Sequence, residues 1–312
     1  MMDPGVTRDL AIELATSLRE EIAPELGRHA GREHAGAGAG GDVTFAIDER
    51  AEAFMERFLA ERAPEVAFYS EDRGLVSPGG DPEWVLVVDP IDGTRPAMAG
   101  FEAACVSVAA APLADGEPTF ADVQVGCVVE IKSGRAFVAV RGKGLDAAPA
   151  LSANTDVSRM FWAYGLRGRP VRRVAEVLGE LIDTSSVGGG TFDLGSATYD
   201  MTRVVTGQLD AYIEPGSRMI ADIPGIREEF ERIGDGVVLN NSPYDLAAAV
   251  LICEEAGAIV TDAYGESPGP RRLLGSGADF QLSCVTACTP ELHARIIGEL
   301  DAGIARLAEA MR

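Results

Sequence analysis

Positive charge, histidine and paired cysteines are all scarce in this 312-residue chain. Lysine and arginine total 27 against 49 aspartates and glutamates, which gives a formal net charge of −22. Such an acidic chain repels phosphate backbones and anionic lipid surfaces, so we expect no general binding to nucleic acid or to membranes. The five cysteines form no CxxC pair, and the three histidines show no i, i+4 spacing. These absences exclude a disulfide framework and a helical zinc site, and they favour a reducing, cytoplasmic location.

Long apolar runs are missing as well. No run approaches the roughly 20 residues that cross a bilayer, and residues 1–25 carry acidic side chains where a signal peptide has its apolar core. The composition, 46% hydrophobic and 24% charged, is typical of globular proteins. At about 150 residues per domain, the length predicts two domains or one large one. We expect the division near Gly144–Asn154 and assign residues 1–148 and 149–312 to the two domains.

Apolar periodicity predicts a chain of mixed α/β class. Trp84–Val88 is a continuous apolar run, typical of a central strand that is buried on both faces. In the second half, strands and helices alternate, which predicts βαβ units with helices on both faces of a sheet. We expect helices over 7–22, 48–62, 171–182, 196–206 and 243–256, and strands over 66–69, 84–88, 103–111, 122–131, 135–141, 160–165, 184–188, 209–213 and 258–262.

Two segments interrupt this order. Ala35–Gly41 alternates alanine and glycine, but no expected strand precedes it and no helix follows. We therefore predict a surface loop there rather than a dinucleotide-binding loop. Residues 215–241 contain prolines and several glycines around one expected short helix, as an inserted segment would.

The most informative motif is Asp89-Pro90-Ile91-Asp92-Gly93-Thr94, directly after the expected central strand. Two carboxylates on one turn suit a hard cation such as Mg²⁺, which takes oxygen ligands. Backbone N–H groups that the turn leaves free after Gly93 suit an anion. A site for both a cation and a tetrahedral anion matches phosphate-ester hydrolysis. The alternative is an acidic turn at the end of a strand.

Three further acidic clusters favour the functional interpretation. Asp42 and Asp48 flank a short apolar segment, Glu71-Asp72 follows an expected strand, and Asp245 lies in the first turn of an expected helix. Each also has a structural alternative. Asp48 and Asp245 fit helix caps, the latter in a capping box with Ser242, and Glu71-Asp72 fits a solvated turn.

Together these motifs resemble the inositol monophosphatase family, which also contains fructose-1,6-bisphosphatases and nucleotide-3′-phosphatases. The resemblance spans roughly residues 40–290. It is carried by Glu71-Asp72, Trp84–Thr94, Gly142-Lys143-Gly144, Gly195-Ser196-Ala197, Glu214, Asp245-Leu246-Ala247-Ala248 and Glu255-Ala256-Gly257. It implies a layered α/β/α/β/α sandwich, a Mg²⁺-dependent phosphomonoesterase and a homodimer. Residues 1–148 would then form an α+β domain with the metal motif, and residues 149–312 an α/β domain that completes the active site.

The resemblance also implies a role for each matching residue. Two or three Mg²⁺ ions are expected, the first on Glu71, Asp89 and the Ile91 carbonyl, and the second on Asp89, Asp92 and Asp245. Asp72 would assist a weaker third ion. Asp48, Glu71 and Thr94 form the expected catalytic set, in which Asp48 and Thr94 help to activate the attacking water. The N–H groups of Gly93 and Thr94 match a phosphate cradle, and the residues matched to the rest of the substrate are Gly195, Ser196, Ala197, Glu214 and Asp245.

Departures from the family concern the substrate side. Arg95-Pro96-Ala97 replaces Thr-Asn-Phe, Tyr244 replaces a tryptophan, and 215–241 is longer than in simple inositol phosphatases. Thr44 lies four residues before Asp48, as in the archaeal and fructose-bisphosphatase-like branches. We therefore predict a phosphatase of a small polyol or sugar phosphate. The alternatives are a fructose-1,6-bisphosphatase-like or dual-specificity enzyme, and a non-catalytic regulatory protein that binds sugar phosphates.

Arg95 and the segment 215–241 complete the expected site. A guanidinium directly after Gly93-Thr94 suits a second anionic group of the substrate. The alternative is an ion pair with Glu102 or with a metal-site carboxylate. Because 215–241 joins Glu214 to Asp245, we expect it to cover the alcohol end of the substrate as a loop. The alternative is an insertion remote from the site or a dimer contact.

Overall fold

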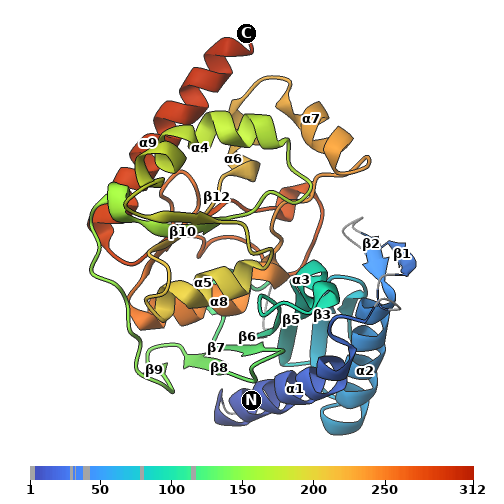
Figure 1. Cartoon of the computed structure of the whole chain (residues 1–312). Helices are drawn as coiled ribbons and strands as arrows, with labels where there is room; N and C mark the ends of the chain where they lie inside the picture. Colours follow the sequence, from blue (N-terminus) through green and yellow to red (C-terminus); the bar gives the residue numbers. More distant parts are fainter. Residues whose placement is uncertain (1–3, 29–30, 32, 38–42, 78–80, 114–116) are drawn as a thin grey trace.

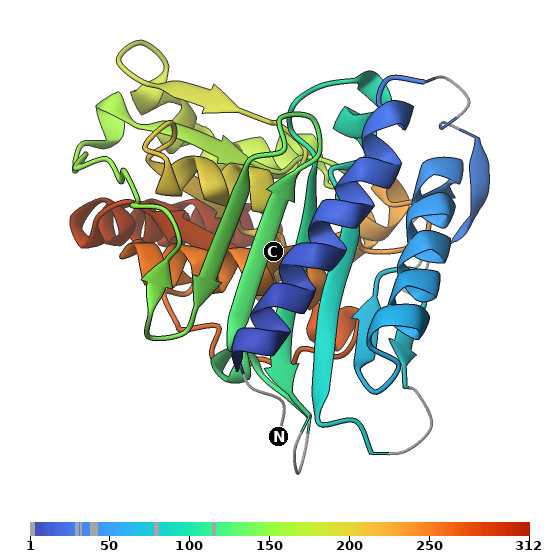
Figure 2. The same cartoon turned by 90° about the horizontal axis from the view of Figure 1, so that it is seen from below.

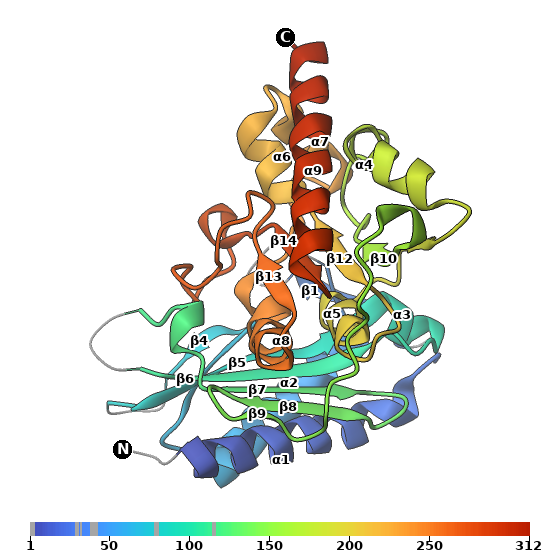
Figure 3. The same cartoon turned by 90° about the vertical axis from the view of Figure 1, so that its left-hand side faces the viewer.

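The chain folds into five stacked layers (Figures 1 and 3), which confirms the α/β/α/β/α sandwich. The computed structural model describes residues 4–28, 31, 33–37, 43–77, 81–113 and 117–312. Within them, no helix is long and apolar enough to cross a membrane. The α-helices are α1 Pro4–Ile22, α2 Ala46–Arg62, α3 Thr94–Ala99, α4 Val171–Ser185, α5 Ala197–Val205, α6 Gly216–Asp222, α7 Ile226–Ile233, α8 Pro243–Ala256 and α9 Pro290–Ala310.

The first sheet has seven strands in the order β4-β3-β5-β6-β7-β8-β9. Helices α1 and α2 lie across its outer face (Figure 2), where the apolar stripe of α1 packs against β6 and β7. Leu14, Leu18 and Ile22 in that stripe are fully buried, as the helical spacing predicts. The strands are β3 Ala67–Ser70, β4 Gly74–Val76, β5 Trp84–Asp92, β6 Cys105–Pro112, β7 Val125–Glu130, β8 Ala136–Val140 and β9 Gly144–Leu145.

Strand β5 is central and every one of its residues is buried, as its apolar run predicts. It continues to Asp92, however, whereas the sequence placed its end at Val88. The pairing with β6 is irregular at this point, because Asp89 pairs with Ser107 while Asp92 pairs with Cys105. One extra residue on β5 therefore forms a bulge. A bulge re-aims side chains, so two carboxylates three residues apart can face the same side of the sheet.

The second sheet has five strands in the order β11-β10-β12-β14-β13. Strand β10 pairs in parallel with both β11 and β12, which confirms the expected βαβ units. The prediction of a strand at 184–188 is wrong, because α4 continues to Ser185 and the strand follows at 190–192. The strands are β10 Phe161–Tyr164, β11 Gly190–Phe192, β12 Ala211–Glu214, β13 Ile259–Thr261 and β14 Cys284–Ala287.

Helix α8 lies between the two sheets with α5, while α4 and α9 cover the outer face of the second sheet (Figure 3). Nearly all of α8 is buried, and its small residues let it approach β7 closely. A Cβ on Gly126 of β7 would lie only 2.6 Å from the Ala248 carbonyl oxygen, so a side chain there would push the helix away. This tight packing fixes the amino end of α8, and with it Asp245, over the first sheet.

The two interrupting segments differ from expectation. Strand β1, His34–Ala37, overlaps the start of the alanine–glycine stretch and pairs with β2 (Val43–Phe45). Residues 38–41 and Asp42 lie outside the described residues. The segment 215–241 contains two helices, α6 and α7, rather than one. Ile226 and Phe230 of α7 are fully buried, so apolar packing holds this segment on the rest of the fold.

Candidate active site

A cavity between the two sheets brings together most of the residues predicted for the site. On one side its wall is formed by Glu71 after β3, by the end of β5 and by Gly93 and Thr94. On the other side lie the loop after β10, the amino end of α5, residues 238–242, Tyr244 and Asp245. The site is thus built by both sheets and by the two helices between them.

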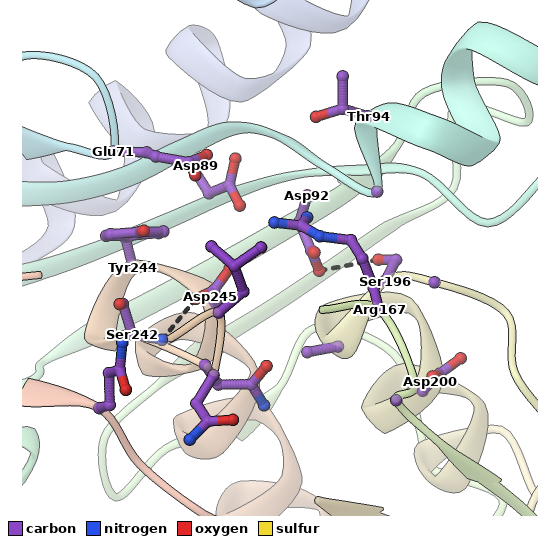
Figure 4. Close-up of a pocket in the computed structure, with 18 of the residues that line it drawn as sticks. Glu71, Asp89, Asp92, Thr94, Arg167, Ser196, Asp200, Ser242, Tyr244 and Asp245 are labelled. Atoms are coloured by element: carbon purple, nitrogen blue, oxygen red, sulfur yellow. Dashed lines mark hydrogen bonds between the residues drawn. The ribbon is translucent and has the colours of Figure 1, made fainter. Parts of the chain in front are cut away.

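Three carboxylates converge in this cavity (Figure 4). One oxygen each of Asp89, Asp92 and Asp245 lies within 4.8 Å of the others. Asp89 and Asp92 are buried at the bulge of β5, whereas Asp245 is half-buried in the first turn of α8. The spacing of these oxygens suits a divalent cation, because hard cations take several carboxylate oxygens at once.

Hydrogen bonds fix one oxygen of each carboxylate and so orient the other. Asp92 Oδ2 accepts from Ser196 Oγ at 2.8 Å, from the Thr198 backbone N–H at 2.6 Å and from the Thr198 hydroxyl. Asp245 Oδ2 accepts from the Ser242 N–H at 2.6 Å. Asp89 Oδ1 accepts from the Ile91 N–H at 2.9 Å. The capping box predicted at Ser242 is present, and it holds Asp245 in place beside the other two carboxylates.

Asp48 and Thr94 form a second pair at the edge of the cavity. The Thr94 hydroxyl lies 3.0 Å from Asp48 Oδ1 and 3.2 Å from the Ile91 carbonyl oxygen. The other oxygen of Asp48 accepts from the Phe45 N–H at 2.9 Å, at the start of α2. Asp48 thus caps α2 with one oxygen and accepts a hydrogen bond from Thr94 with the other. Burial raises the pKa of Asp48 to about 6.

Gly93 is required where β5 turns into α3. Its φ of +93° is the left-handed conformation that L side chains rarely adopt. A Cβ there would also lie 2.5 Å from the Ala103 carbonyl oxygen and 2.9 Å from Ser196 Cβ. Glycine at this position therefore lets the strand end close to α5, with Thr94 at the edge of the cavity.

Crowded acids dominate the electrostatics of the cavity. Burial raises the pKa of Glu71 well above its ordinary value, and the charge of Asp245 raises it further. Burial, followed by the charge of Asp92, does the same for Asp89 and raises the pKa of Asp245 to about 7. Carboxyl groups this close to one another repel when all of them are ionised. The cluster is therefore stabilised by binding either protons or a cation.

The protein without divalent cations is expected to lose stability as the pH rises. A carboxyl whose pKa is higher in the folded chain than in the unfolded one binds more protons when folded, so unfolding becomes easier as the pH increases. Stability is lost over the pH range from near 4, the ordinary pKa of an aspartate, to about 7, the pKa of Asp245 in the folded chain. In EDTA we expect the Tm to fall between pH 5 and pH 8 by about 5 °C or more. Differential scanning fluorimetry across this range measures it.

Mg²⁺ should reverse this loss, and more strongly at pH 8 than at pH 5, because protons compete with the cation at low pH. Sodium chloride of equal ionic strength is the control for general screening of the acidic surface. Asp92→Asn should show a smaller Mg²⁺-dependent rise in Tm than the parent protein. Equal rises with Mg²⁺ and with sodium chloride would contradict cation binding at the cluster.

Of the residues predicted to contact the alcohol part of the substrate, some line the cavity and others do not. Gly195, Ser196 and Ala197 line the cavity. Glu214 at the end of β12 is fully buried and lies behind Arg169, whose Nε donates to Glu214 Oε1 at 2.8 Å. A substrate in the cavity therefore reaches Arg169 before Glu214.

Two of the predicted charged residues lie beside the cavity rather than in its wall. Asp72 accepts a hydrogen bond from Thr44 Oγ1 at 2.8 Å. The Arg95 guanidinium carbon lies 5.4 Å from the centre of the Phe45 ring, and Arg95 lines an adjoining cavity. Glu102 forms an ion pair with Lys132 at 2.7 Å, and the two alternatives for Arg95 stay predictions.

The segment 215–241 covers the site only at its end. Residues 238–241 line the cavity, whereas no residue of α6 or α7 lies in its wall, and α6 contacts α9. The expectation that the whole segment covers the substrate is therefore wrong for its two helices. Helix α6 contacts α7 and α9 instead, and Ile226 and Phe230 of α7 belong to the larger hydrophobic core.

Sequence reasoning missed two arginines and two further acids. Arg167 and Arg169 lie in the loop between β10 and α4, and both line the cavity, together with Asp193 and Asp200. The sequence contains a signal for the two arginines, because Arg167-Gly168-Arg169 follows an expected strand in a chain poor in basic residues. Loops at the carboxyl ends of parallel strands are where α/β sheets bind ligands.

Comparisons with known proteins agree with this arrangement. The profile of the inositol monophosphatase family matches residues 4–305. A fructose-1,6-bisphosphatase/inositol-1-monophosphatase of Methanothermobacter thermautotrophicus is 28% identical over 94% of this chain and 96% of the relative. An inositol-1-monophosphatase of Mycobacterium leprae is 29% identical over 83% and 84% of the two chains. An inositol monophosphatase structure from Thermotoga maritima superposes with a TM-score of 0.70 at 18% identity, covering 96% of this chain and 98% of that one. The chain belongs to the inositol monophosphatase family of phosphatases.

Proposed function

We propose that this protein is a Mg²⁺-dependent phosphomonoesterase that hydrolyses a small polyol or sugar phosphate. The observation that carries the proposal is the cluster of Asp89, Asp92 and Asp245, with three oxygens within 4.8 Å of one another, beside the Thr94–Asp48 pair. Membership of a phosphatase family agrees with it. A cation site next to a proton-accepting pair is what hydrolysis of a phosphate ester requires.

The donor set fits Mg²⁺. It consists of hard oxygen donors, and the cavity wall described here contains no cysteine or histidine that would favour a softer metal. Glu71, Asp89 and the Ile91 carbonyl would hold one ion, and Asp89, Asp92 and Asp245 another, with Asp72 assisting a third. When bound, such ions lower the pKa of water and neutralise charge on the leaving oxygen.

The protein's own groups supply orientation and a path for the proton. Because Asp48 accepts from the Thr94 hydroxyl, a lone pair of the Thr94 oxygen can accept a hydrogen bond from the attacking water. Asp48 is held by the Phe45 N–H, so the pair is preorganised before substrate enters. The N–H groups of Gly93 and Thr94 would bind the oxygens of the transferred phosphate.

The substrate class rests on two further observations. Relatives are named for inositol-1-monophosphatase activity, alone or combined with fructose-1,6-bisphosphatase activity. The two arginines in the cavity favour the second, dual-specificity candidate, because an inositol monophosphate carries no second anionic group for them.

A phosphate-release assay tests the proposal directly. The purified protein should release phosphate from inositol 1-phosphate or fructose 1,6-bisphosphate in the presence of Mg²⁺, and excess EDTA should abolish the release. Re-addition of Mg²⁺ should restore it. Binding of these esters without turnover would favour the non-catalytic alternative, and turnover that is unchanged in EDTA would contradict the role of the metal.

A further inference from the structure

We propose that a second cavity, outside the active site, binds a small molecule with a phosphate or carboxylate group, and that its occupant changes turnover at the carboxylate cluster. The second cavity lies between the inserted segment 215–241 and the loop 262–283, which joins β13 to β14. Its volume is about 320 Å³, which is within the range of small-molecule sites in proteins. Binding there is independent of the proposed function, whereas the effect on turnover rests on it.

Arg218 holds the two walls of the second cavity together. In Figure 3 the loop between β13 and β14 lies below α6, and the Arg218 side chain of α6 is only 9% exposed. Its Nη1 donates to the Ala263 carbonyl oxygen at 2.6 Å, and its Nη2 pairs with Asp301 Oδ1 at 2.6 Å. The Tyr264 hydroxyl of the loop donates in turn to Asp222 Oδ1 of α6 at 2.8 Å. Because these contacts exist before a ligand binds, binding requires little ordering of the walls.

Two further arginines, Arg227 of α7 and Arg271 of the loop, line the second cavity. Their side chains are 50% and 53% exposed. Arg227 Nη1 lies 3.8 Å from Glu231 Oε1. Arg271 Nη2 lies 3.7 Å from Asp262 Oδ2, and both distances exceed that of a hydrogen bond. Within the described residues, these two guanidinium groups therefore keep their N–H donors for a ligand, and such planar donors match phosphate and carboxylate oxygens.

The wall of the second cavity is basic, although the chain as a whole is acidic. Its described residues include three arginines and one acidic residue, Asp262, whereas the chain has 27 basic and 49 acidic residues. Asp262 Oδ1 already accepts from two backbone N–H groups, at 2.9 and 3.0 Å. The neighbouring acids Asp222 and Asp301 are paired with Arg218. The two half-exposed arginines therefore attract a small anion to this cavity.

Two residues, Asn240 and Gln281, belong to the walls of both cavities. Gln281 Nε2 donates to the Val238 carbonyl oxygen at 2.6 Å, and Asn240 Nδ2 donates to Ser217 Oγ at 3.2 Å. Asn240 Oδ1 is buried and has no hydrogen-bond partner within the described residues. An acceptor buried without a partner costs free energy, so binding of a donor to it is favourable. The shared wall therefore responds to a ligand that reaches Asn240.

This shared wall also connects the second cavity to the carboxylate cluster. The Ser242 N–H at its end donates to Asp245 Oδ2 at 2.6 Å and so caps α8. The Leu282 N–H donates to the Asn241 carbonyl oxygen at 2.8 Å, which bonds the loop between β13 and β14 to the same segment. A ligand that shifts this loop therefore shifts the support of Asp245, and the two sites are coupled.

Removing both half-exposed arginines tests the binding. The double variant Arg227→Met with Arg271→Met keeps two long side chains and removes their charge, and it should fold because exposed ion pairs contribute little stability. The probes are sulfate, a tetrahedral dianion like a phosphate group, and citrate, a carboxylate. Both are added in EDTA, because the metal-free carboxylate cluster repels anions. Sodium chloride of equal ionic strength is the control for screening.

In the parent protein, at least one of the two anions should raise the Tm by about 2 °C or more above the sodium chloride control. A rise with sulfate identifies a site for phosphate groups, and a rise with citrate identifies a site for carboxylates. The double variant should lose this rise. Arg232→Met replaces an exposed arginine of α7 outside the wall of the second cavity, and as the matched control it should keep the rise.

Steady-state kinetics on a phosphomonoester, with free Mg²⁺ held constant, test the effect on turnover. An anion that competes with the substrate at the carboxylate cluster raises KM and leaves kcat unchanged. In the parent protein and in Arg232→Met, the anion that raised the Tm should in addition change kcat by about twofold or more. In the double variant it should change KM alone. Without added anion, all three proteins should have the same kcat.

Three results would overturn the proposal. A Tm in the parent protein that rises no more than with sodium chloride would show that the second cavity binds neither kind of anion. An equal rise in the double variant would show that the anion binds elsewhere. An equal change of kcat in the parent protein and the double variant would contradict the coupling. If the protein hydrolyses no phosphomonoester, the proposed function and the coupling fail together, while the Tm measurements still decide whether the second cavity binds an anion.

Discussion

Asp92→Asn is expected to lower kcat/KM by roughly 10³-fold or more while leaving the fold intact. The side chain keeps its shape, and its amide oxygen can still accept from Ser196 and Thr198 as Asp92 Oδ2 does now. The amide nitrogen then replaces Oδ1, the other oxygen of a carboxylate that supplies one ligand atom of the cluster. The cluster thereby loses a negative charge and a cation ligand, and several kcal/mol of transition-state stabilisation disappear with them.

Steady-state kinetics with saturating Mg²⁺ measure this loss. The matched control is Asp183→Asn, which removes an equal charge from an exposed position in α4 and should leave kcat/KM unchanged. Because the like-charge repulsion at the cluster also falls, the metal-free Asp92→Asn protein should melt no lower than the parent. Activity within tenfold of the parent would contradict a role for Asp92 in binding the cation.

The sequence predicts those parts of the site in which the contacting residues are close together along the chain. The capping box at Ser242 and Asp245 depends on residues three apart, and so does the bond from the Phe45 N–H to Asp48. For both acids the sequence left a choice between a helix cap and a site residue. The structure shows that the two descriptions are compatible. Asp48 accepts from the Phe45 N–H with one oxygen and from Thr94 with the other, and Asp245 both caps α8 and belongs to the carboxylate cluster.

The sequence could not predict contacts between distant segments. Arg169 and Glu214 are 45 positions apart, and their ion pair depends on the parallel pairing of β10 with β12. The bulge in β5 depends likewise on its register with β6. Neither register can be read from periodicity, because an apolar run shows that a strand is buried without showing its partner. The substrate side of the cavity is therefore where prediction and structure differ most.

Thr94→Ala is expected to lower kcat by about 10²- to 10⁴-fold, the range for a group that takes part in proton transfer. The variant loses the hydroxyl that links Asp48 to the edge of the cavity, at 3.0 Å from Asp48 Oδ1, while the carboxylate cluster stays intact. Because the lost interaction matters mainly in the transition state, KM and the Mg²⁺-dependent rise in Tm should change little. Thr94→Ser keeps the hydroxyl and should retain most of the activity.

Asp48→Asn should lower kcat far less when it is added to Thr94→Ala than when it is made in the parent protein, because the two side chains act as one unit. A rise in KM at constant kcat, or fully additive effects of the two substitutions, would show that Thr94 binds the substrate rather than orienting the attacking water with Asp48.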